Sequence, residues 1–161
     1  PSLEFIRRYA PDRAASIIDI GGGLSRLADH LLAAGFQNLS VLDISSEAMA
    51  LARDRLGDRG KSIEWIVSDV TKWTPEKVYD LWHDRAVFHF LTEFDDQMAY
   101  IARLKHALKH GGYLVIGTFA LDGPEKCSGL PVMRHDSHSL QNLLGEAFKL
   151  IETRKHDHQT P

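Results

Sequence analysis

A glycine-rich turn that joins a short strand to a helix is the feature that most constrains how this chain can fold. Residues 16–20 form an apolar run that contains Asp19, and Gly21, Gly22 and Gly23 follow it directly. Such a unit lets a ligand approach the backbone N–H groups at the start of the helix. Apolar residues with helical spacing then continue toward Gly35, a candidate C-cap, at Leu24, Leu27, Ala28, Leu31 and Leu32.

The rest of the chain repeats this alternation of strand and helix. Short apolar runs predict further strands at residues 39–44, 63–67, 78–83, 113–119 and 148–153. The predicted helices cover residues 3–10, 45–57, 95–110 and 137–145. Because parallel strands need crossover connections, which helices supply, the pattern predicts one α/β domain over residues 1–161 with a doubly wound, mostly parallel sheet.

Composition excludes several classes of protein. The chain has 161 residues, of which 43% are hydrophobic, enough for one domain with a buried core. Its formal net charge of -3 gives no general attraction to phosphate backbones or anionic lipids, so we expect neither nucleic-acid nor membrane binding. The single Cys127 excludes an intramolecular disulfide and a cysteine-based zinc site. No apolar run approaches the ~20 residues that a bilayer-spanning helix needs.

The cellular location is predicted from cysteine usage and from the N-terminal residues. A single cysteine fits a reducing compartment, and the first residues contain no signal-peptide core. We therefore expect a cytoplasmic location, or an organellar matrix if a targeting peptide has been removed before Pro1. The sequence does not predict the oligomeric state.

The spacing of the glycines argues against a dinucleotide ligand. A dinucleotide-binding fingerprint has its third glycine five residues after the first, and Arg26 occupies that position here. The bulk of this side chain would obstruct a pyrophosphate at the start of the helix. What remains is Gly21-x-Gly23-x-Ser25 behind Asp19, whose carboxylate suits a cationic ligand such as a nucleoside sulfonium better than a phosphate.

Two further acids stand at strand ends. Asp43 closes the second strand, where a carboxylate can accept hydrogen bonds from both ribose hydroxyls. The alternative role of Asp43 is a helix cap, which Ser45 could provide instead. Asp69 closes the third strand, where its carboxylate could accept from an adenine amine while the Val70 amide donates to a ring nitrogen. Asp69 could also cap the short turn at Thr71.

These segments together resemble the class I S-adenosylmethionine-dependent methyltransferases. The likeness covers nearly the whole chain and rests on Asp19-Ile20-Gly21-Gly22-Gly23, Val41-Leu42-Asp43-Ile44-Ser45, Ser68-Asp69-Val70 and Tyr79-Asp80-Leu81-Trp82-His83-Asp84. It implies a Rossmann-like fold that binds S-adenosylmethionine and releases S-adenosylhomocysteine. It further implies that Gly21 and Gly23 border the methionine part, that Asp43 binds ribose, and that Asp69 and Val70 bind adenine. Asp19 and Ile44 complete the predicted set of donor-binding residues.

The chain departs from the family pattern in two places. Ser25 replaces the last glycine of the family's usual G-x-G-x-G, which narrows the space near the carboxylate of the methyl donor. The family's seventh, antiparallel strand is missing, and Thr160-Pro161 resembles the approach to it. We therefore expect a sheet that lacks this strand or is truncated there.

The segment after the fourth strand supplies the candidate catalytic residues. Methyl transfer from a sulfonium is an in-line displacement, so the protein must mainly align the acceptor and exclude water. Asp84 is the first candidate, because its carboxylate could orient an acceptor amine and stabilise its growing positive charge. It could instead cap a helix or pair with Arg85. His83 is the second candidate, and both His83 and His89 could carry protons or be packed core residues.

Residues 82–92 resemble the methyltransferase branch that includes the citrate synthase-lysine methyltransferases. This resemblance implies an amine acceptor, with a protein lysine ahead of small amines. Two other functions stay open, namely a noncatalytic nucleoside-binding or scaffold module and a nicotinamide-dependent oxidoreductase, against which Arg26 argues. We expect no metal site, because no third ligand accompanies the histidine pairs at His135 with His138 and at His156 with His158.

Overall fold

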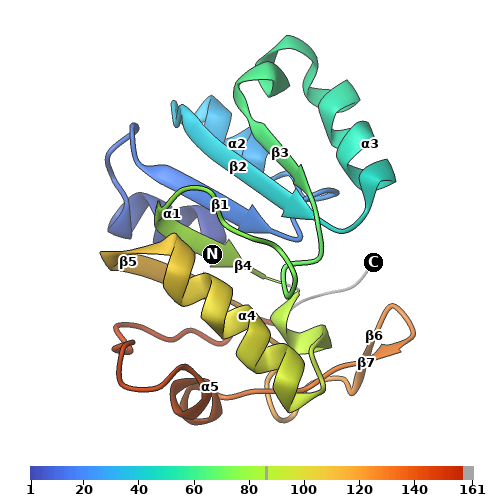
Figure 1. Cartoon of the computed structure of the whole chain (residues 1–161), viewed down its shortest axis with the longest axis vertical. Coiled ribbons are helices and arrows are strands. Elements are labelled where there is room, and N and C mark those ends of the chain that lie inside the picture. Colours follow the sequence, from blue (N-terminus) through green and yellow to red (C-terminus); the bar gives the residue numbers. More distant parts are fainter. Residues whose placement is uncertain (86, 158–161) are drawn as a thin grey trace.

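The computed structural model describes residues 1–85 and 87–157, in which a parallel five-stranded sheet has helices on both faces (Figure 1). All neighbouring strands of this sheet are parallel, and the chain runs outward from β1 to β3 before it returns to β4 on the other side of β1. The predicted doubly wound parallel sheet is therefore confirmed. The strand order is β3-β2-β1-β4-β5, with β1 at Ser16–Ile20, β2 at Asn38–Asp43, β3 at Glu64–Val67, β4 at Tyr79–Asp84 and β5 at Leu108–Ile116.

Helices and short 3-10 turns connect the strands. The Ser45 hydroxyl accepts a hydrogen bond from the Ala48 amide at 3.1 Å, so Ser45 caps the helix after β2, as the sequence allowed. A capping box at Asp136 begins the last helix. The helices are α1 Ser2–Tyr9, α2 Leu27–Ala33, α3 Ser46–Leu56, α4 Phe94–Ala107 and α5 Ser137–Leu144, the 3-10 turns are η1 Gly57–Ser62 and η2 Phe88–Phe90, and a small hairpin joins β6 Lys126–Cys127 to β7 Leu130–Pro131.

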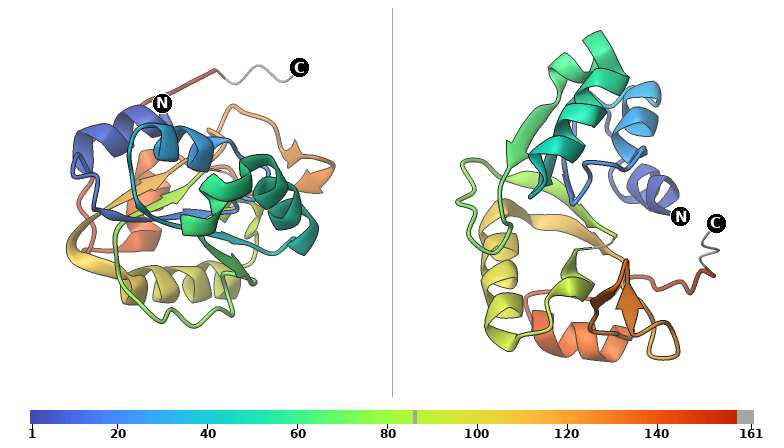
Figure 2. Two further views of the ribbon diagram at one scale, coloured as in Figure 1. Left: turned by 90° about the horizontal axis from the view of Figure 1, so that it is seen from above. Right: turned by 90° about the vertical axis from the view of Figure 1, so that its right-hand side faces the viewer.

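The sheet separates two hydrophobic clusters. Side chains along a strand point alternately to opposite faces, so Ile17 of β1 packs with α1, α2 and α3, while Ile18 and Ile20 pack with α4 and α5. Figure 2 shows α1, α2 and α3 on one side of the sheet and α4 on the other. Burial on both faces explains why β1, β2 and β4 do not alternate between buried and exposed residues, whereas the edge strands β3 and β5 are more exposed.

Two predicted element boundaries differ from the structure. Helix α2 begins at Leu27, and Leu24, predicted to lie on its apolar face, is 67% exposed in the preceding turn. The fifth strand begins at Leu108, within the predicted helix, because a register irregularity beside Tyr79 and the positive φ of Gly111 (78°) let the chain continue along β4.

The predicted sixth strand is wrong. Residues 148–153 form no strand in the described part of the chain, and the side chain of Glu152 binds α1 instead. Thr160-Pro161, the predicted approach to a seventh strand, lie outside the described residues. None of the helices described here is long and apolar enough to cross a lipid bilayer.

Candidate functional site

The glycine turn lies at the point of the sheet where the direction of winding reverses. β1 stands between β2 and β4, and open α/β sheets bind ligands beyond the carboxyl ends of the strands at this switch point. The Gly21 amide donates to the Leu42 carbonyl at 2.7 Å. Gly21 has a φ of 71°, a backbone conformation that residues other than glycine rarely adopt. A Cβ atom on Gly21 would also collide with Val87, so the turn and the segment after β4 are in direct contact.

Asp43 is held against this turn. Its Oδ2 accepts a hydrogen bond from the Gly23 amide at 3.0 Å, and its Oδ1 accepts one from the Ser45 amide at 2.9 Å. A Cβ on Gly23 would lie 2.8 Å from Asp43 Oδ2 and 2.9 Å from the Ala48 Cβ, so only glycine fits here. The next residue, Ile44, is 72% exposed at the same edge of the sheet. The half-buried carboxylate of Asp43 and the exposed side chain of Ile44 therefore lie at the end of β2, next to the turn.

Asp19 is buried beneath the turn with one carboxylate oxygen unused. Its Oδ1 accepts from Nδ1 of His83 at 2.7 Å, and the two side chains are 6% and 4% exposed. Its Oδ2 is buried and has no hydrogen-bond partner among the described residues. A Cβ on Gly22 would collide with Asp19 Oδ2, so this oxygen lies directly under the glycines. An unpaired buried oxygen is costly, which makes a ligand group at this position favourable.

Asp69 and Val70 lie at the end of β3. The Asp69 Oδ1 accepts from the Thr71 hydroxyl at 2.7 Å and from its amide at 2.9 Å, and the hydroxyl hydrogen bond is the main cause of a lowered pKa of the Asp69 carboxyl group. The side chain therefore caps the turn at Thr71, the alternative that the sequence left open. Val70 is buried in the core at 5% exposure. The adenine contact of these two residues stays a prediction.

The candidate catalytic residues are both buried and hydrogen-bonded within the protein. Asp84 is fully buried and accepts from the amides of Val87 and Phe88 at 2.8 and 3.0 Å, so it caps η2. It also accepts from the Tyr100 hydroxyl at 2.6 Å, and burial, together with the charge of this carboxylate, raises the pKa of Tyr100 well above its usual value. His83 binds Asp19. The predicted contact of Asp84 and His83 with a methyl acceptor stays a prediction.

Some residues around this site could not be identified from the sequence. Tyr100 is completely buried on α4 between Asp84 and the Trp82 indole, whose Nε1 donates to its hydroxyl at 2.9 Å. Ser2, at the start of α1, lies 2.9 Å from Nε2 of His83. A tyrosine on an apolar helix face and a serine at a helix start are common, so neither carried a usable signal.

Two histidines, His89 of η2 and His135, form a second buried group. His89 is 2% exposed and stacks on Phe119, with ring centroids 5.0 Å apart, and neither of its ring nitrogens has a partner in the described part of the chain. His135 contacts the Phe88 ring and lies 3.2 Å from the Ser139 hydroxyl. Burial lowers the pKa of both imidazoles. Within residues 1–85 and 87–157, no group of three or more metal-ligating side chains is present.

A comparison with protein families identifies what kind of domain carries this site. Residues 17–112, from β1 into β5, match the family model described as a methyltransferase domain. The chain belongs to this methyltransferase family. The matched segment of the methyltransferase includes the glycine turn, Asp19, Asp43, Asp69 and Asp84, so the carboxylates of the candidate site lie within the family region.

Curated relatives of this methyltransferase match about two thirds of the chain. Malonyl-[acyl-carrier protein] O-methyltransferase 1 of Ilyobacter polytropus is 34% identical over 106 residues, which are 65% of this chain and 38% of that protein. N-terminal Xaa-Pro-Lys N-methyltransferase 1 of Homo sapiens is 28% identical over 123 residues, 71% of this chain and 54% of that protein. The match to the first of these relatives thus spans well under half of its length.

Solved structures share the fold of this methyltransferase. The glycopeptide N-methyltransferase MtfA, complexed with (S)-adenosyl-L-methionine, aligns with a TM-score of 0.64 and 21% identity over 75% of this chain and 54% of its own. The amino pentose methyltransferase CalS10 from Micromonospora echinaspora aligns with a TM-score of 0.63 and 23% identity over 76% of this chain and 50% of its own. The predicted Rossmann-like class I fold is therefore confirmed, while the citrate synthase-lysine branch stays a prediction.

Proposed function

We propose that this methyltransferase binds S-adenosylmethionine at the glycine turn and transfers its methyl group to a nucleophilic acceptor. The observation that carries this proposal is the placement of two acidic side chains against that turn: Asp43 accepts from the Gly23 amide, and Asp19 Oδ2 lies beside Gly22. Asp69 follows the neighbouring strand β3. The glycopeptide N-methyltransferase MtfA, which shares this fold, has been crystallised with S-adenosylmethionine, S-adenosylhomocysteine and sinefungin.

The residues present fit such a molecule. The unpartnered Oδ2 of Asp19 is a buried acceptor that a cationic amine would satisfy. Gly21, Gly22 and Gly23 carry no side chains, so a ligand can approach the backbone of the turn closely. Asp43 Oδ2 is bound only to a backbone amide in the described residues, and hydroxyls of a ribose could share this oxygen. Exposed Ile44 supplies an apolar surface for a base.

The chemistry follows from the charge of the donor and the burial of the site. When bound, S-adenosylmethionine supplies an electrophilic methyl group on a positively charged sulfur. The protein residues bind and orient the donor and exclude water. Asp19 and Asp43 hold the donor, and Asp84 fixes the η2 segment through the Val87 and Phe88 amides. Val87 in turn packs against Gly21, so the carboxylate of Asp84 positions the segment that borders the glycine turn.

The acceptor class is an amine in this proposal, with a protein lysine ahead of small amines. Relatives are named for an acyl-carrier protein ester and for a protein N-terminus, so acceptors differ among proteins of this fold. Asp84 and His83 remain the proposed residues nearest to the acceptor. A protonated amine must first lose its proton; the neutral amine then needs only alignment, and no metal ion, to form its bond to the methyl carbon as the bond from that carbon to sulfur breaks.

Binding and transfer are tested by two measurements on the full chain. Isothermal titration with S-adenosylhomocysteine should give saturable binding, and titration with NAD should give none. Incubation of a host lysate with the protein and methyl-labelled S-adenosylmethionine should then label a protein or small-molecule fraction. Binding without any labelled product would favour a noncatalytic nucleoside-binding module, and binding of NAD alone would favour an oxidoreductase.

A further inference from the structure

A buried hydrogen-bonded chain connects the first residue of α1 to the glycine turn. His83 Nδ1 donates to Asp19 Oδ1 at 2.7 Å, and the other ring nitrogen, Nε2, lies 2.9 Å from the Ser2 hydroxyl. In the neutral tautomer that donates to Asp19, Nε2 is an acceptor, so the Ser2 hydroxyl donates to it. This chain fixes the imidazole at both ends and leaves Asp19 Oδ2 beneath the glycines.

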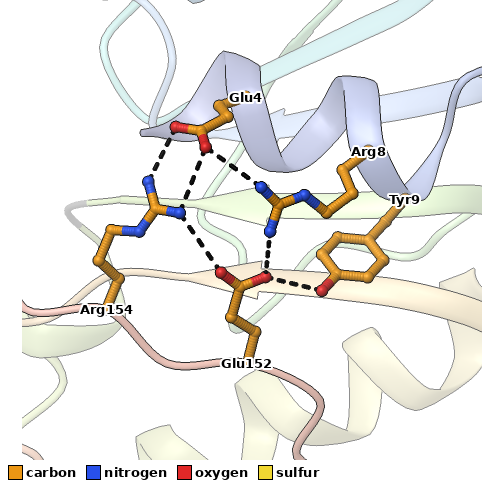
Figure 3. Close-up of polar contacts among 5 residues, drawn as sticks. All are labelled: Glu4, Arg8, Tyr9, Glu152 and Arg154. Atoms are coloured by element: carbon orange, nitrogen blue, oxygen red, sulfur yellow. Dashed lines mark hydrogen bonds and ion pairs between the residues drawn. The ribbon is translucent and has the colours of Figure 1, made fainter.

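A network of charged side chains holds α1 against the C-terminal segment (Figure 3). Glu152 accepts from Arg8 at 2.7 Å and from the Tyr9 hydroxyl at 2.8 Å. Arg154 donates to Glu4 at 2.8 and 3.2 Å and to Glu152 at 3.4 Å. Three residues of α1 are therefore bound to two residues that lie more than 140 positions later in the chain.

Apolar contacts accompany this network. The Arg154 guanidinium lies over the Phe5 ring, 5.0 Å from its centroid, and the Tyr9 ring is 5.1 Å from that of Tyr113 on β5. Ile6 is completely buried in the cluster beneath α1. Isolated exposed ion pairs contribute little, but a network with a buried anchor and ring contacts orients a short helix. The helix is thus fixed in the position that places Ser2 on His83.

We propose that α1 is part of the methyl-donor site, in which Ser2 and His83 position Asp19 while Glu152 and Arg154 hold the helix in place. His83 and Ser2 are positioning residues here, because they act on the donor through the Asp19 carboxylate. The inference rests on the proposed function, since it concerns binding of S-adenosylmethionine and its product at that same site.

The physical reason is the need to fix a buried carboxylate. An Asp side chain with one bound oxygen keeps its second oxygen in a defined direction, and burial strengthens that hydrogen bond. Without the Ser2 hydroxyl, Nε2 of His83 would lose its partner and the imidazole would lose one of its two anchors. Asp19 would then be oriented less well toward the donor, so binding would weaken while the fold persists.

The first test uses calorimetric titration of the full chain with S-adenosylhomocysteine. We expect Ser2→Ala to weaken binding by about 3- to 10-fold, because one partly buried hydrogen bond is lost. Ser2→Thr keeps the hydroxyl and should restore affinity to within about twofold of the wild type. Equal affinity of Ser2→Ala and wild type, or equal weakening by both substitutions, would overturn the inference and leave the proposed function intact. A wild type that binds no S-adenosylhomocysteine would overturn both.

The second test addresses the network at the C-terminal segment. Glu152→Gln removes the carboxylate that binds Arg8 and Arg154, and we expect about two- to fivefold weaker binding of S-adenosylhomocysteine and faster amide exchange over residues 3–9. The matched control is Lys155→Gln, which breaks the exposed ion pair with Asp122 in the same segment without touching α1. Faster exchange with unchanged affinity, or equal effects of both variants, would overturn the role of the network.

Discussion

The two carboxylate oxygens of Asp43 accept hydrogen bonds from two different backbone amides. Oδ1 binds the Ser45 amide at the start of α3, and Oδ2 binds the Gly23 amide across the turn. The first contact holds the carboxylate rotamer, while the second oxygen faces the side on which we place the ribose. Because Ser45 itself caps α3, the Asp43 carboxylate is not required for that role.

Replacing Asp43 with alanine should therefore impair donor binding more than folding. We expect Asp43→Ala to weaken binding of S-adenosylhomocysteine by about 1–3 kcal/mol, because the ribose hydroxyls lose their acceptor. Titration calorimetry measures this change. Asp54→Ala, at an exposed position on α3, is the control and should bind like the wild type. Unchanged affinity of Asp43→Ala would remove the ribose assignment.

A substitution at Asp84 can distinguish an effect on donor binding from an effect on the methyl-transfer rate. The Asp84 carboxylate accepts from the Val87 and Phe88 amides and the Tyr100 hydroxyl among its partners in the described residues, and asparagine at this position offers one acceptor oxygen and an NH₂ group instead. We expect Asp84→Asn to lower the methyl-transfer rate more than the affinity for S-adenosylhomocysteine, since η2 and not the glycine turn loses its support. Steady-state rates and calorimetry on the same preparation compare the two losses, and equal losses would indicate a purely structural residue.

At the scale of elements, Tyr100 joins α4 to β4 and η2. Its hydroxyl donates to Asp84 and accepts from the Trp82 indole, and all three side chains are fully buried. Tyr100→Phe would leave a buried carboxylate and a buried N–H group with one partner fewer. We expect it to lower the free energy of unfolding by about 1–3 kcal/mol, as measured in urea.

The matched control for Tyr100→Phe is Tyr113→Phe, on the partly exposed edge of β5. This substitution should change the free energy of unfolding by no more than about 0.5 kcal/mol. If Tyr100→Phe were as stable as this control, the buried hydroxyl would contribute nothing to the junction of β4, η2 and α4.

The elements that the sequence predicts are those whose signals are local. Apolar runs predict β1 to β4, and the glycines of the turn predict the switch point of the sheet. Both signals are local, because each lies in residues that are adjacent in the sequence. The sixth strand fails because an apolar run at 148–153 becomes a strand only if another strand pairs with it. The Glu152 contact with α1 joins residues 143 and 144 positions apart, which no local pattern contains.

For the candidate site residues too, some properties can be recognised from the local sequence, and others depend on tertiary packing. Glycines and strand-end acids are recognisable since their chemistry and place in the strand–turn–helix unit coincide. The direction in which a buried side chain points is a tertiary property, so the sequence could not show that His83 faces Asp19 and Ser2, or that Asp84 caps η2. The alternatives of a capping role for Asp84 and for Asp69 were visible in the sequence, but only packing decides between them.

At the scale of the whole molecule, the proposed donor site lies at the edge of a sheet whose two faces carry separate hydrophobic clusters. α1, α2 and α3 pack on one face, and α4 and α5 pack on the other. The buried histidines His89 and His135 lie in the second half, where the segment after β4 meets the segment after β5: the Met133 amide donates to the His89 carbonyl and the His135 amide to the Phe119 carbonyl. Their ionisation therefore affects how these two segments pack.

Stability of the molecule should fall as the pH drops below about 6.5, the usual pKa of histidine. Burial lowers the pKa of His89 and His135 in the folded protein; the charge of His135 lowers the pKa of His89 further, while Asp136 acts in the opposite direction on His135. Between the lowered pKa and 6.5 the unfolded chain binds more protons, so the free energy of unfolding rises with pH in that window and is fully present above it.

Urea unfolding at pH 7.5 and pH 5.5 measures this dependence. We expect His89→Gln to reduce the loss of stability between the two pH values, because glutamine does not titrate and its amide can take the place of the imidazole. His106→Gln, at an exposed position on α4, is the control and should retain the wild-type loss. An identical pH dependence in His89→Gln and wild type would mean that the buried imidazole is protonated without cost, and the packing of η2 against the segment after β5 would then be independent of its charge.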